Sequence, residues 1–195
     1  MTSHEMSVAA RASAFSDLLG RYIATDGERV VQDLEAAVSA ACARLTAVAA
    51  SGGKVYLVGN GGSAAVASHA ATDFFNTAKL RALTLHESSL LTCMTNDFGY
   101  DKAYARMLSQ MVEPGDLVVA ISSSGQSMNI RNAAAQAAAS GAQVITLSGF
   151  QRDNPLRSAG MINFWLDSSD YGMVEIGHQF ILHTISDRLR AALTG

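Results

Sequence analysis

The stretch DLVVAISSSGQS, residues 116–127, contains the transition that decides the fold. Its first half is apolar at nearly every position and carries β-branched residues, which is typical of a strand buried on both faces of a parallel sheet. Its second half is a turn of small hydroxyl side chains, and a helix should begin after it, near Ser127 or Met128. The segment therefore predicts a strand, a serine loop (residues 122–127) and a helix in direct succession.

The same order of elements recurs along the chain. Residues 54–58 (KVYLV) lead into the glycine turn GNGGS at 59–63, and residues 143–147 (QVITL) lead into Ser148 and Gly149. Weaker strands are expected at 82–85 and 162–166, alanine-rich helical stretches separate the strands, and a long helix is expected from about 172 to 193. This alternation predicts an α/β fold, a doubly wound parallel sheet flanked by helices, in which ligands bind beyond the carboxyl ends of the strands.

The first fifty residues have a different pattern and contain no proline. Apolar residues recur there every three or four positions, as at Val30, Leu34, Ala37, Val38, Ala41 and Leu45. This spacing predicts helices, and a break near residues 25–27 divides the segment in two. We therefore expect residues 1–50 to form an N-terminal helical pair that belongs to the same domain and makes oligomer contacts. Residues 51–195 then form the ligand-binding part.

Length and composition limit the functions open to this chain. Its 195 residues, 49% of them hydrophobic, suffice for one domain with a full core. A formal net charge of −3, without any stripe of lysine or arginine, argues against nucleic acid. No apolar run approaches the roughly 18 residues of a membrane span, and the N-terminus lacks the apolar core of a signal peptide, so a cytoplasmic location is expected. Cys42 and Cys93 are expected to be buried free thiols in helices.

The serine loop is the candidate phosphate site. Hydroxyl groups are carried by Ser122, Ser123, Ser124 and Ser127. Free backbone N–H groups and the positive end of the helix dipole face outward at such a turn, so it suits a dianionic phosphate ester. The alternative is that the serines only start the helix. The glycine turn at 59–63 lacks both the Lys-Ser/Thr ending of a nucleotide P-loop and the full GxGxxG spacing, so no nucleotide cofactor is expected.

Two pairs of ionisable side chains are candidates for proton transfer or metal binding. His69 and Asp73 lie four apart on the helix that follows the glycine turn, so they share a face. Glu175 and His183 lie eight apart on the last helix, roughly 80° apart around its axis, and can also share a face. Imidazoles and carboxylates suit a divalent metal such as zinc, and they suit proton transfer beside a carbonyl. The alternative is that His69 packs between helices and the other three are surface residues.

The order and spacing of these motifs resemble the sugar isomerase (SIS) family, and within it the sedoheptulose 7-phosphate isomerases, also called phosphoheptose isomerases. The resemblance covers nearly the whole chain: GNGGSAA at 59–65, LT at 91–92 before NDFGY at 96–100, GDL at 115–117, ISSSGQS at 121–127, and the closing helix with Glu175, His178 and His183. It implies a flavodoxin-like fold and an aldose–ketose isomerase that acts on a seven-carbon sugar phosphate through an enediol. It also implies a homotetramer with active sites at subunit interfaces, and zinc in at least some members.

The resemblance further implies roles for individual residues. The serine loop anchors the phosphate, and the remaining substrate contacts come from Asn60, Gly61, Gly62, Ser63, Asn96, Asp97 and Glu175. The metal ligands implied are His69, Asp73, Glu175 and His183. Among these, Glu175 or Asp73 removes the proton next to the carbonyl, and His183 acts as the partner acid.

Two of these four positions depart from the family pattern, which reads His, Glu, Gln, His. Asp73 stands in place of the Glu and Glu175 in place of the Gln, a correlated change that would move the base to Glu175. Residues 74–77 lack the basic residue that often follows in these enzymes, and residues 85–89 also differ from the family. His86 is either a sugar contact or an exposed loop residue, while His178 is expected to pack or to form an interface.

A rival hypothesis is a binding module without catalysis, which senses sugar phosphates or assists a partner protein such as a replication initiator. Such a module needs the serine loop but has no need of acid, base or metal ligands. Because ionisable residues are kept at all four matching positions, the sequence favours the enzyme.

Overall fold

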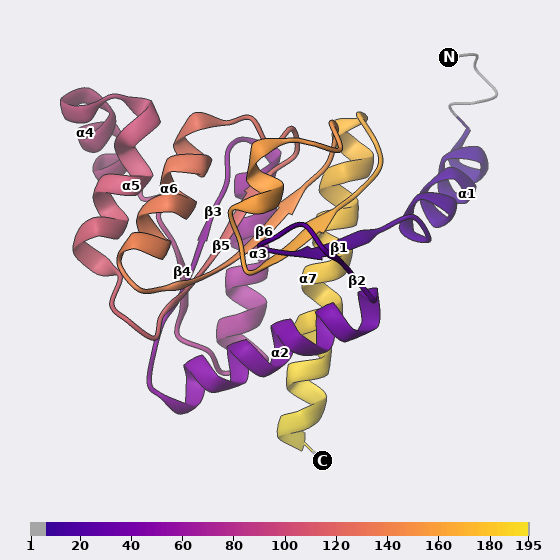
Figure 1. The fold of residues 1–195 in the computed structure, drawn as a ribbon, viewed down its shortest axis with the longest axis horizontal. Helices are drawn as coiled ribbons and strands as arrows, with labels where there is room; N and C mark the ends of the chain where they lie inside the picture. The colour runs from indigo at the N-terminus through magenta and orange to yellow at the C-terminus, as the bar shows by residue number, and fades with distance from the viewer. Residues whose placement is uncertain (1–6, 195) are drawn as a thin grey trace.

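A seven-stranded sheet with the strand order β2-β1-β7-β6-β5-β3-β4 forms the centre of the computed structural model, which describes residues 7–194 (Figure 1). The strands from β3 to β7 are parallel to one another. Their bounds are β3 Val55–Val58, β4 Ala82–Thr84, β5 Leu117–Ser122, β6 Gln143–Ser148 and β7 Ile162–Trp165. These elements confirm the predicted α/β fold, and each lies within one or two residues of its expected place.

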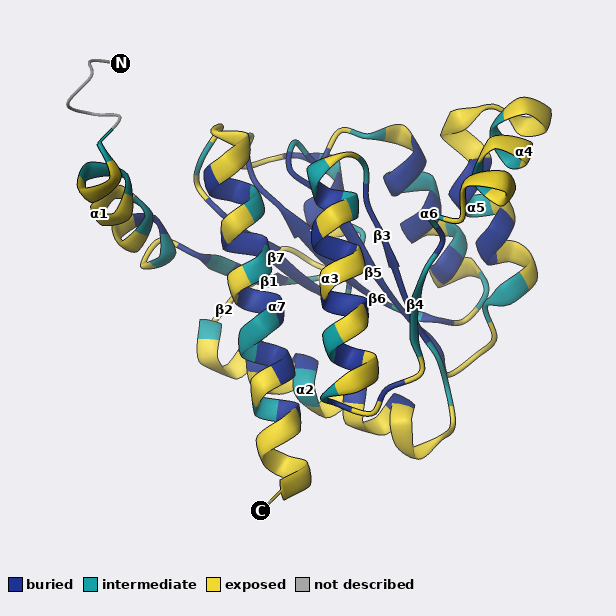
Figure 2. Cartoon of the chain, turned by 180° about the vertical axis from the view of Figure 1, so that it is seen from behind, coloured by how far each residue is buried: buried dark blue, intermediate teal, exposed yellow. Residues whose placement is uncertain are grey.

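Helices cover both faces of the sheet. One face packs against α2 (Leu34–Ala50), α3 (Gly62–Asn76) and α7 (Tyr171–Thr194) (Figure 2). The other packs against α5 (Tyr100–Met111) and α6 (Met128–Ala139), with α4 (Ser88–Phe98) lying on α5. Alternate residues of each strand point to opposite faces. In β3, for example, Val55 and Leu57 join the first core and Tyr56 and Val58 the second.

The two expected N-terminal helices are present, but the break between them, expected near residues 25–27, is a β-hairpin that the sequence did not predict. α1 (Val8–Leu19) is followed by β1 (Ile23–Asp26) and β2 (Val31–Gln32), and β1 pairs antiparallel with β7. The Asp26 carboxylate closes the turn by accepting hydrogen bonds from two backbone N–H groups beyond it. The second helix begins only after Asp33, whose side chain caps it. Val30, counted as a helix position in the sequence, is 54% exposed in the turn.

The two cysteines lie on helices and differ in exposure. Cys93 is exposed on α4 and Cys42 is half-buried on α2, so the expectation of two buried thiols is wrong for Cys93 and holds only in part for Cys42. Helix α4 buries none of its residues and packs only through half-buried ones, which is why apolar neighbours do not cover the thiol. Within residues 7–194, every helix is too short or too polar to cross a lipid bilayer.

The order of the strands reverses between β3 and β5. From β3 the chain passes through α3 to β4 on one side, whereas β5, β6 and β7 follow one another on the other side. The loops that leave β3 and β5 therefore diverge to opposite faces of the sheet and leave a crevice between them, the usual ligand site of an open parallel sheet. The glycine turn and the serine loop both lie at this crevice.

Candidate active site

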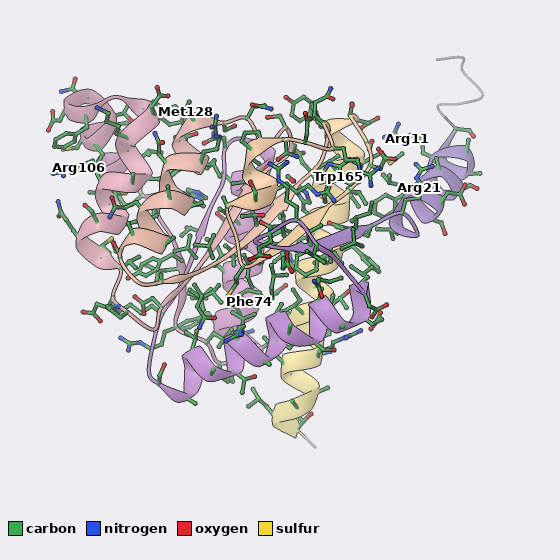
Figure 3. All side chains as sticks on the ribbon, viewed as in Figure 1. Arg11, Arg21, Phe74, Arg106, Met128 and Trp165 are labelled. Carbon is green, nitrogen blue, oxygen red and sulfur yellow. The ribbon has the colours of Figure 1, made fainter. Side chains whose placement is uncertain are left out.

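A cavity of about 240 Å³ opens at the carboxyl ends of β3 and β5. Its lining consists of Asn60, Gly61, Gly62, Ser63, Ser122, Ser123, Ser124, Ser127, Tyr171 and Glu175. All of these except Tyr171 are substrate-binding residues expected from the sequence, and they come from three separate segments of the chain. Met128, at the start of α6, and Trp165, at the end of β7, both lie toward the carboxyl ends of the strands, where the cavity opens (Figure 3).

The serine loop forms one wall of the cavity and leads directly from β5 into α6. Gly125 takes a left-handed conformation, with φ of 65°, and its N–H donates to the carbonyl of Ser122 at 3.0 Å. The Ser122 hydroxyl donates to that of Ser127 at 3.2 Å, and Ser123 and Ser63 bring their hydroxyls within 3.4 Å across the cavity. The loop is therefore folded back on itself with its hydroxyl groups gathered at one place.

Two helices begin at this cavity, and neither has a side-chain cap among the described residues. Helix α6 follows Ser127 and helix α3 follows Gly61. The first N–H groups of an α-helix have no partner inside the helix, and they carry the positive end of its dipole. The cavity is thus bounded by two sets of backbone donors and several hydroxyls, which is an environment for an anion.

A network of amides that the sequence does not reveal connects the two walls. Asn60, from the glycine turn, and Asn129, from the first turn of α6, exchange side-chain hydrogen bonds of 2.9 and 2.8 Å. The Tyr100 hydroxyl donates to Asn60 at 2.7 Å, and the Tyr104 hydroxyl donates to the carbonyl of Gly59 at 3.0 Å. Asn129 is 2% exposed. No local motif marks it, because its partner lies 69 residues away.

Glu175 brings a carboxylate to the wall of the same cavity. It projects from α7 onto the backbone at the start of α3, where a Cβ built on Gly62 would meet the carboxylate oxygens at 2.2 and 2.3 Å. Only glycine leaves room for this side chain. The carboxylate therefore lies at an uncapped helix start, in the same cavity as the serine hydroxyls.

His69, Asp73 and His183 form a second cluster, in the groove between α3 and α7. Asp73 Oδ2 lies 3.4 Å from His69 Nε2 and 3.1 Å from His183 Nδ1, and the three ligand atoms are all within 4.8 Å of one another. Asp73 Oδ2 is buried and accepts no hydrogen bond from any described residue. Two imidazole nitrogens and one carboxylate oxygen converging in this way fit a divalent ion such as zinc, with a coordination position left open.

Glu175 is not part of this cluster, although the sequence resemblance placed it among the metal ligands. Eight residues separate it from His183 on one continuous helix, which amounts to about 12 Å along the axis at a rise of about 1.5 Å per residue. A fourth ligand to an ion held by this cluster would have to come from water, from substrate or from a second copy of the chain. His69 and His183 have side chains 56% and 45% exposed, so the cluster is open to any of these. Figure 2 shows exposed residues along α3 and α7, the two helices that carry the cluster.

Asn96 and Asp97 do not line the cavity. Both are exposed on α4, where the Asn96 amide donates to the Asp97 carboxylate at 3.0 Å. The expectation that they contact the sugar has no support within one protomer, because α4 packs on α5 and carries them on its solvent-facing side. A motif that follows a helix pattern does not reveal which way the helix faces until its packing is known.

The remaining histidines differ in burial. His86 is half-buried, not exposed: its Nδ1 lies 3.3 Å from the Ser68 hydroxyl, and burial lowers its pKa. His178 is fully buried on α7, as the packing interpretation expects, and burial lowers its pKa to about 4. Neither lines the cavity.

Comparison with known proteins agrees with this geometry. A family model described as SIS domain matches residues 21–149. Phosphoheptose isomerase of Mycobacterium tuberculosis is 37% identical over 158 residues, which cover 77% of this chain and 79% of the relative. That of Campylobacter concisus is 35% identical, with 80% and 85% covered. The structure of phosphoheptose isomerase from Neisseria gonorrhoeae superimposes with a TM-score of 0.81 at 26% identity, covering 97% of this chain and all of the other. The chain therefore belongs to the SIS domain family, within which it is related to the phosphoheptose isomerases.

Proposed function

We propose that this chain is a sugar-phosphate isomerase of the phosphoheptose isomerase type, which interconverts sedoheptulose 7-phosphate and an aldose heptose 7-phosphate through an enediol. The observation that carries the proposal is the presence of one carboxylate, Glu175, in the same cavity as the serine loop. An anion site alone would suit a sensor of sugar phosphates, whereas an added base beside it suits proton transfer.

The serine loop is the proposed phosphate anchor. The phosphate oxygens accept hydrogen bonds from the hydroxyls of Ser122, Ser123, Ser124 and Ser127 and from the free N–H groups at the start of α6. Asn60 and Ser63 stand on the opposite wall, where they meet the sugar hydroxyls. Binding by these contacts holds the carbonyl end of the sugar at a fixed distance from Glu175.

Glu175 is the proposed base. Its carboxylate removes the proton from the hydroxyl-bearing carbon next to the carbonyl while the carbonyl oxygen takes a proton from water, which gives the enediol. The carboxylic acid then returns its proton to the former carbonyl carbon while the neighbouring hydroxyl loses its proton to water and becomes the new carbonyl. Asp73 is a poorer choice for this step because its Oδ2 lies between His69 and His183. The correlated departures at positions 73 and 175 thereby receive one explanation, a base relocated from α3 to α7.

His69, Asp73 and His183 are the proposed metal ligands, for zinc or another divalent ion. When bound, such an ion would act as a Lewis acid on a sugar oxygen that reaches the groove between α3 and α7. The ligand cluster also fixes His183, whose ring packs against that of His69 with centroids 4.9 Å apart.

The metal assignment is tested by metal content. Asp73→Asn should reduce the divalent metal retained by the purified protein at least 10-fold, as expected when one of three protein ligands is lost. Asp187→Asn is the control, because Asp187 is an exposed acid on α7 paired with Arg190. Equal metal content in both variants would contradict the assignment.

A homotetramer with active sites at its subunit interfaces is part of the proposal. It is supported by exposed apolar residues on the face that carries the ligand cluster, notably Phe75 at 65%, Ile176 at 55% and Phe180 at 48% exposure. Helices α1 and α7 also form an apolar groove with Phe15 and Met173 in its lining.

The expected cytoplasmic location, and a small-molecule ligand in place of nucleic acid, remain predictions of the sequence.

The decisive experiment measures turnover of sedoheptulose 7-phosphate and exchange of the proton next to its carbonyl in deuterated water. Glu175→Gln should lower both rates by roughly 10²- to 10⁴-fold, the contribution of a general base, and His183→Ala should lower turnover as well. Glu113→Gln, an exposed acid that pairs with Lys54, serves as the control. Unchanged rates in both site variants would exclude the mechanism. Binding without any exchange by the unaltered protein would instead indicate the sugar-phosphate sensor.

A further inference from the structure

We propose that Asn154 is a positioning residue for phosphate binding, which holds the serine loop in the shape that receives the phosphate. The inference rests on the proposed function, since it concerns the same phosphate site. Asn154 does not line the cavity; it follows β6 and caps the short helix η1 (Pro155–Ser158). Its effect on the ligand is therefore exerted through the loop.

The side chain of Asn154 packs directly against the turn of the loop. It is fully buried, and a Cβ built on Gly125 would lie 1.9 Å from its Oδ1 and 2.3 Å from its Cγ. Gly125 is the left-handed residue on which the loop reverses direction. The amide group thus occupies the space behind the turn, and the turn cannot relax toward the protein interior.

The hydrogen bonds of Asn154 fix its amide in this place. Nδ2 donates to Ser148 Oγ at 3.2 Å, to the carbonyl of Gly149 at 3.0 Å and to the carbonyl of Gln151 at 2.9 Å. Oδ1 accepts from the N–H of Arg157 at 3.2 Å. The amide is therefore bound to the end of β6 on one side and to η1 on the other.

The end of β6 is in turn bonded to the serine loop. Ser148 pairs with Ser122 in the sheet, and the N–H of Gly149 donates to the carbonyl of Ser123 at 2.8 Å. Asn154 consequently reaches the loop by two routes, through Gly125 and through the β6 end. The second route ends on Ser122 and Ser123, which line the cavity, and the first ends on the turn between Ser124 and Ser127, which also line it.

The chemistry of the amide matters as much as its shape. An aspartate in this place would be nearly identical in size, but it cannot donate to the carbonyls of Gly149 and Gln151. Its negative charge would also lie behind a turn whose other side receives a dianion. Serine would keep the cap of η1, because its hydroxyl can accept from the N–H of Arg157, but it is too short to support Gly125.

A matched control exists in the same sheet. Asn163 is equally buried on β7 and forms a comparable set of bonds, accepting from Thr146 Oγ1 at 2.7 Å and from the N–H of Gly160 at 2.9 Å. It pairs with Thr146, two residues before Ser148, and so lies away from the loop. Substituting it removes a buried amide network of similar extent without touching the phosphate site.

The test compares Asn154→Ser, Asn154→Asp and Asn163→Ser with the unaltered protein, using inorganic phosphate as the probe and calorimetry well below the unfolding temperature. We expect the Kd for phosphate to rise on the order of 10-fold in Asn154→Ser, the effect of losing one well-placed buried hydrogen-bonding group. The rise should be larger in Asn154→Asp. In turnover of the sugar phosphate, the KM should rise while the kcat stays within about two-fold, because Glu175 is untouched.

Asn163→Ser should lower the unfolding temperature without changing the Kd for phosphate. An unchanged Kd in Asn154→Ser, beside normal binding by the unaltered protein, would overturn the inference and leave the proposed function standing. The same rise in Asn163→Ser would also overturn it, since general destabilisation would then suffice. Absence of phosphate binding by the unaltered protein would refute the phosphate site itself, and the inference with it.

Discussion

Glu175 is the residue whose environment says most about the chemistry of the cavity. Its carboxylate rests on the backbone of Gly62 with no room for a Cβ beneath it. A side chain held this closely at the start of a helix has little freedom to turn, and such fixed placement is what a base needs. The position of Glu175 is thus set by the absence of a side chain at residue 62.

Gly62→Ala should therefore impair catalysis without removing any functional group. The added methyl group forces the Glu175 carboxylate away, and a displacement of about 1 Å costs roughly 100-fold in kcat. Gly20→Ala is the control: Gly20 has an ordinary helical conformation, and its nearest contact is the Asp17 carbonyl at 3.5 Å. A kcat for Gly62→Ala within two-fold of normal, measured on sedoheptulose 7-phosphate, would argue against Glu175 as the base.

His178 makes the folded protein sensitive to acid. Burial holds the pKa of its imidazole at about 4 in the folded chain, below its usual 6.5. As the pH falls from 6.5 toward 4, the unfolded chain binds a proton here and the folded chain does not, so the free energy of unfolding decreases over that window. The loss amounts to about 3 kcal/mol for this single group.

His178→Gln should flatten this dependence. The variant lacks the titrating group, so between pH 6.5 and pH 4 its free energy of unfolding should fall by about 3 kcal/mol less than that of the unaltered protein. Urea unfolding at several pH values measures the difference, and the slope is the quantity to compare, since the substitution also changes packing. Parallel curves would show that His178 takes up no extra proton on unfolding.

Strand β5, the serine loop and helix α6, residues 117–139, together form the candidate anion site. The uncapped start of α6 and the serine hydroxyls converge on the cavity, so an anion bound there stabilises the folded state alone. At a phosphate concentration 100 times its Kd the stabilisation is about 2.7 kcal/mol, which raises the unfolding temperature by roughly 5 to 10 °C in a chain of this size.

Ser124→Ala should reduce this stabilisation by phosphate. It removes one donor at the cavity wall, whereas the control Ser109→Ala removes a hydroxyl that only bonds within α5, to the carbonyl of Arg106. Differential scanning fluorimetry across a phosphate titration gives the comparison. If phosphate raised the unfolding temperature equally in the two variants, the anion would bind at a site other than the serine loop.

The sequence predicts elements well where the signal is local. Continuous apolar runs mark β3, β5 and β6, and the transition at Ser122 correctly places the start of α6. The hairpin at 23–32 is missed because its short strands owe their place to pairing with β7, more than 130 residues away. For the same reason the sequence cannot place Asn129 or Asn154, whose roles depend on partners from other segments, or separate Glu175 from the histidine cluster.

For the whole molecule, the proposed tetramer has a direct consequence. The apolar groove between α1 and α7 includes Val8, which is 87% exposed, and Ile176, and a second copy that covers these residues would remove them from water. Helix α1 extends away from the body of the protein (Figure 1), as expected of an element that packs against another subunit.

Val8→Asp combined with Ile176→Asp should therefore lower the mass of the assembly measured by light scattering. A charge buried in an apolar contact is strongly unfavourable, so the subunits should separate while each keeps its helical content. Lys102→Asp, on the far side of the sheet in α5, is the control. A tetramer mass retained by the double variant would exclude this groove from the interface, and a monomeric mass for the unaltered protein would exclude the tetramer.

The sheet itself ends in very short strands at both edges. β2 has two residues and β4 has three, so neither edge offers the long row of free N–H and carbonyl groups on which another chain could add a strand. Copies of this protein can therefore meet at high concentration without joining their sheets into a continuous, aggregating ribbon. An ordered assembly must therefore form through the helical faces of the protein. There the side chains determine which surfaces fit together and how many subunits the closed oligomer contains.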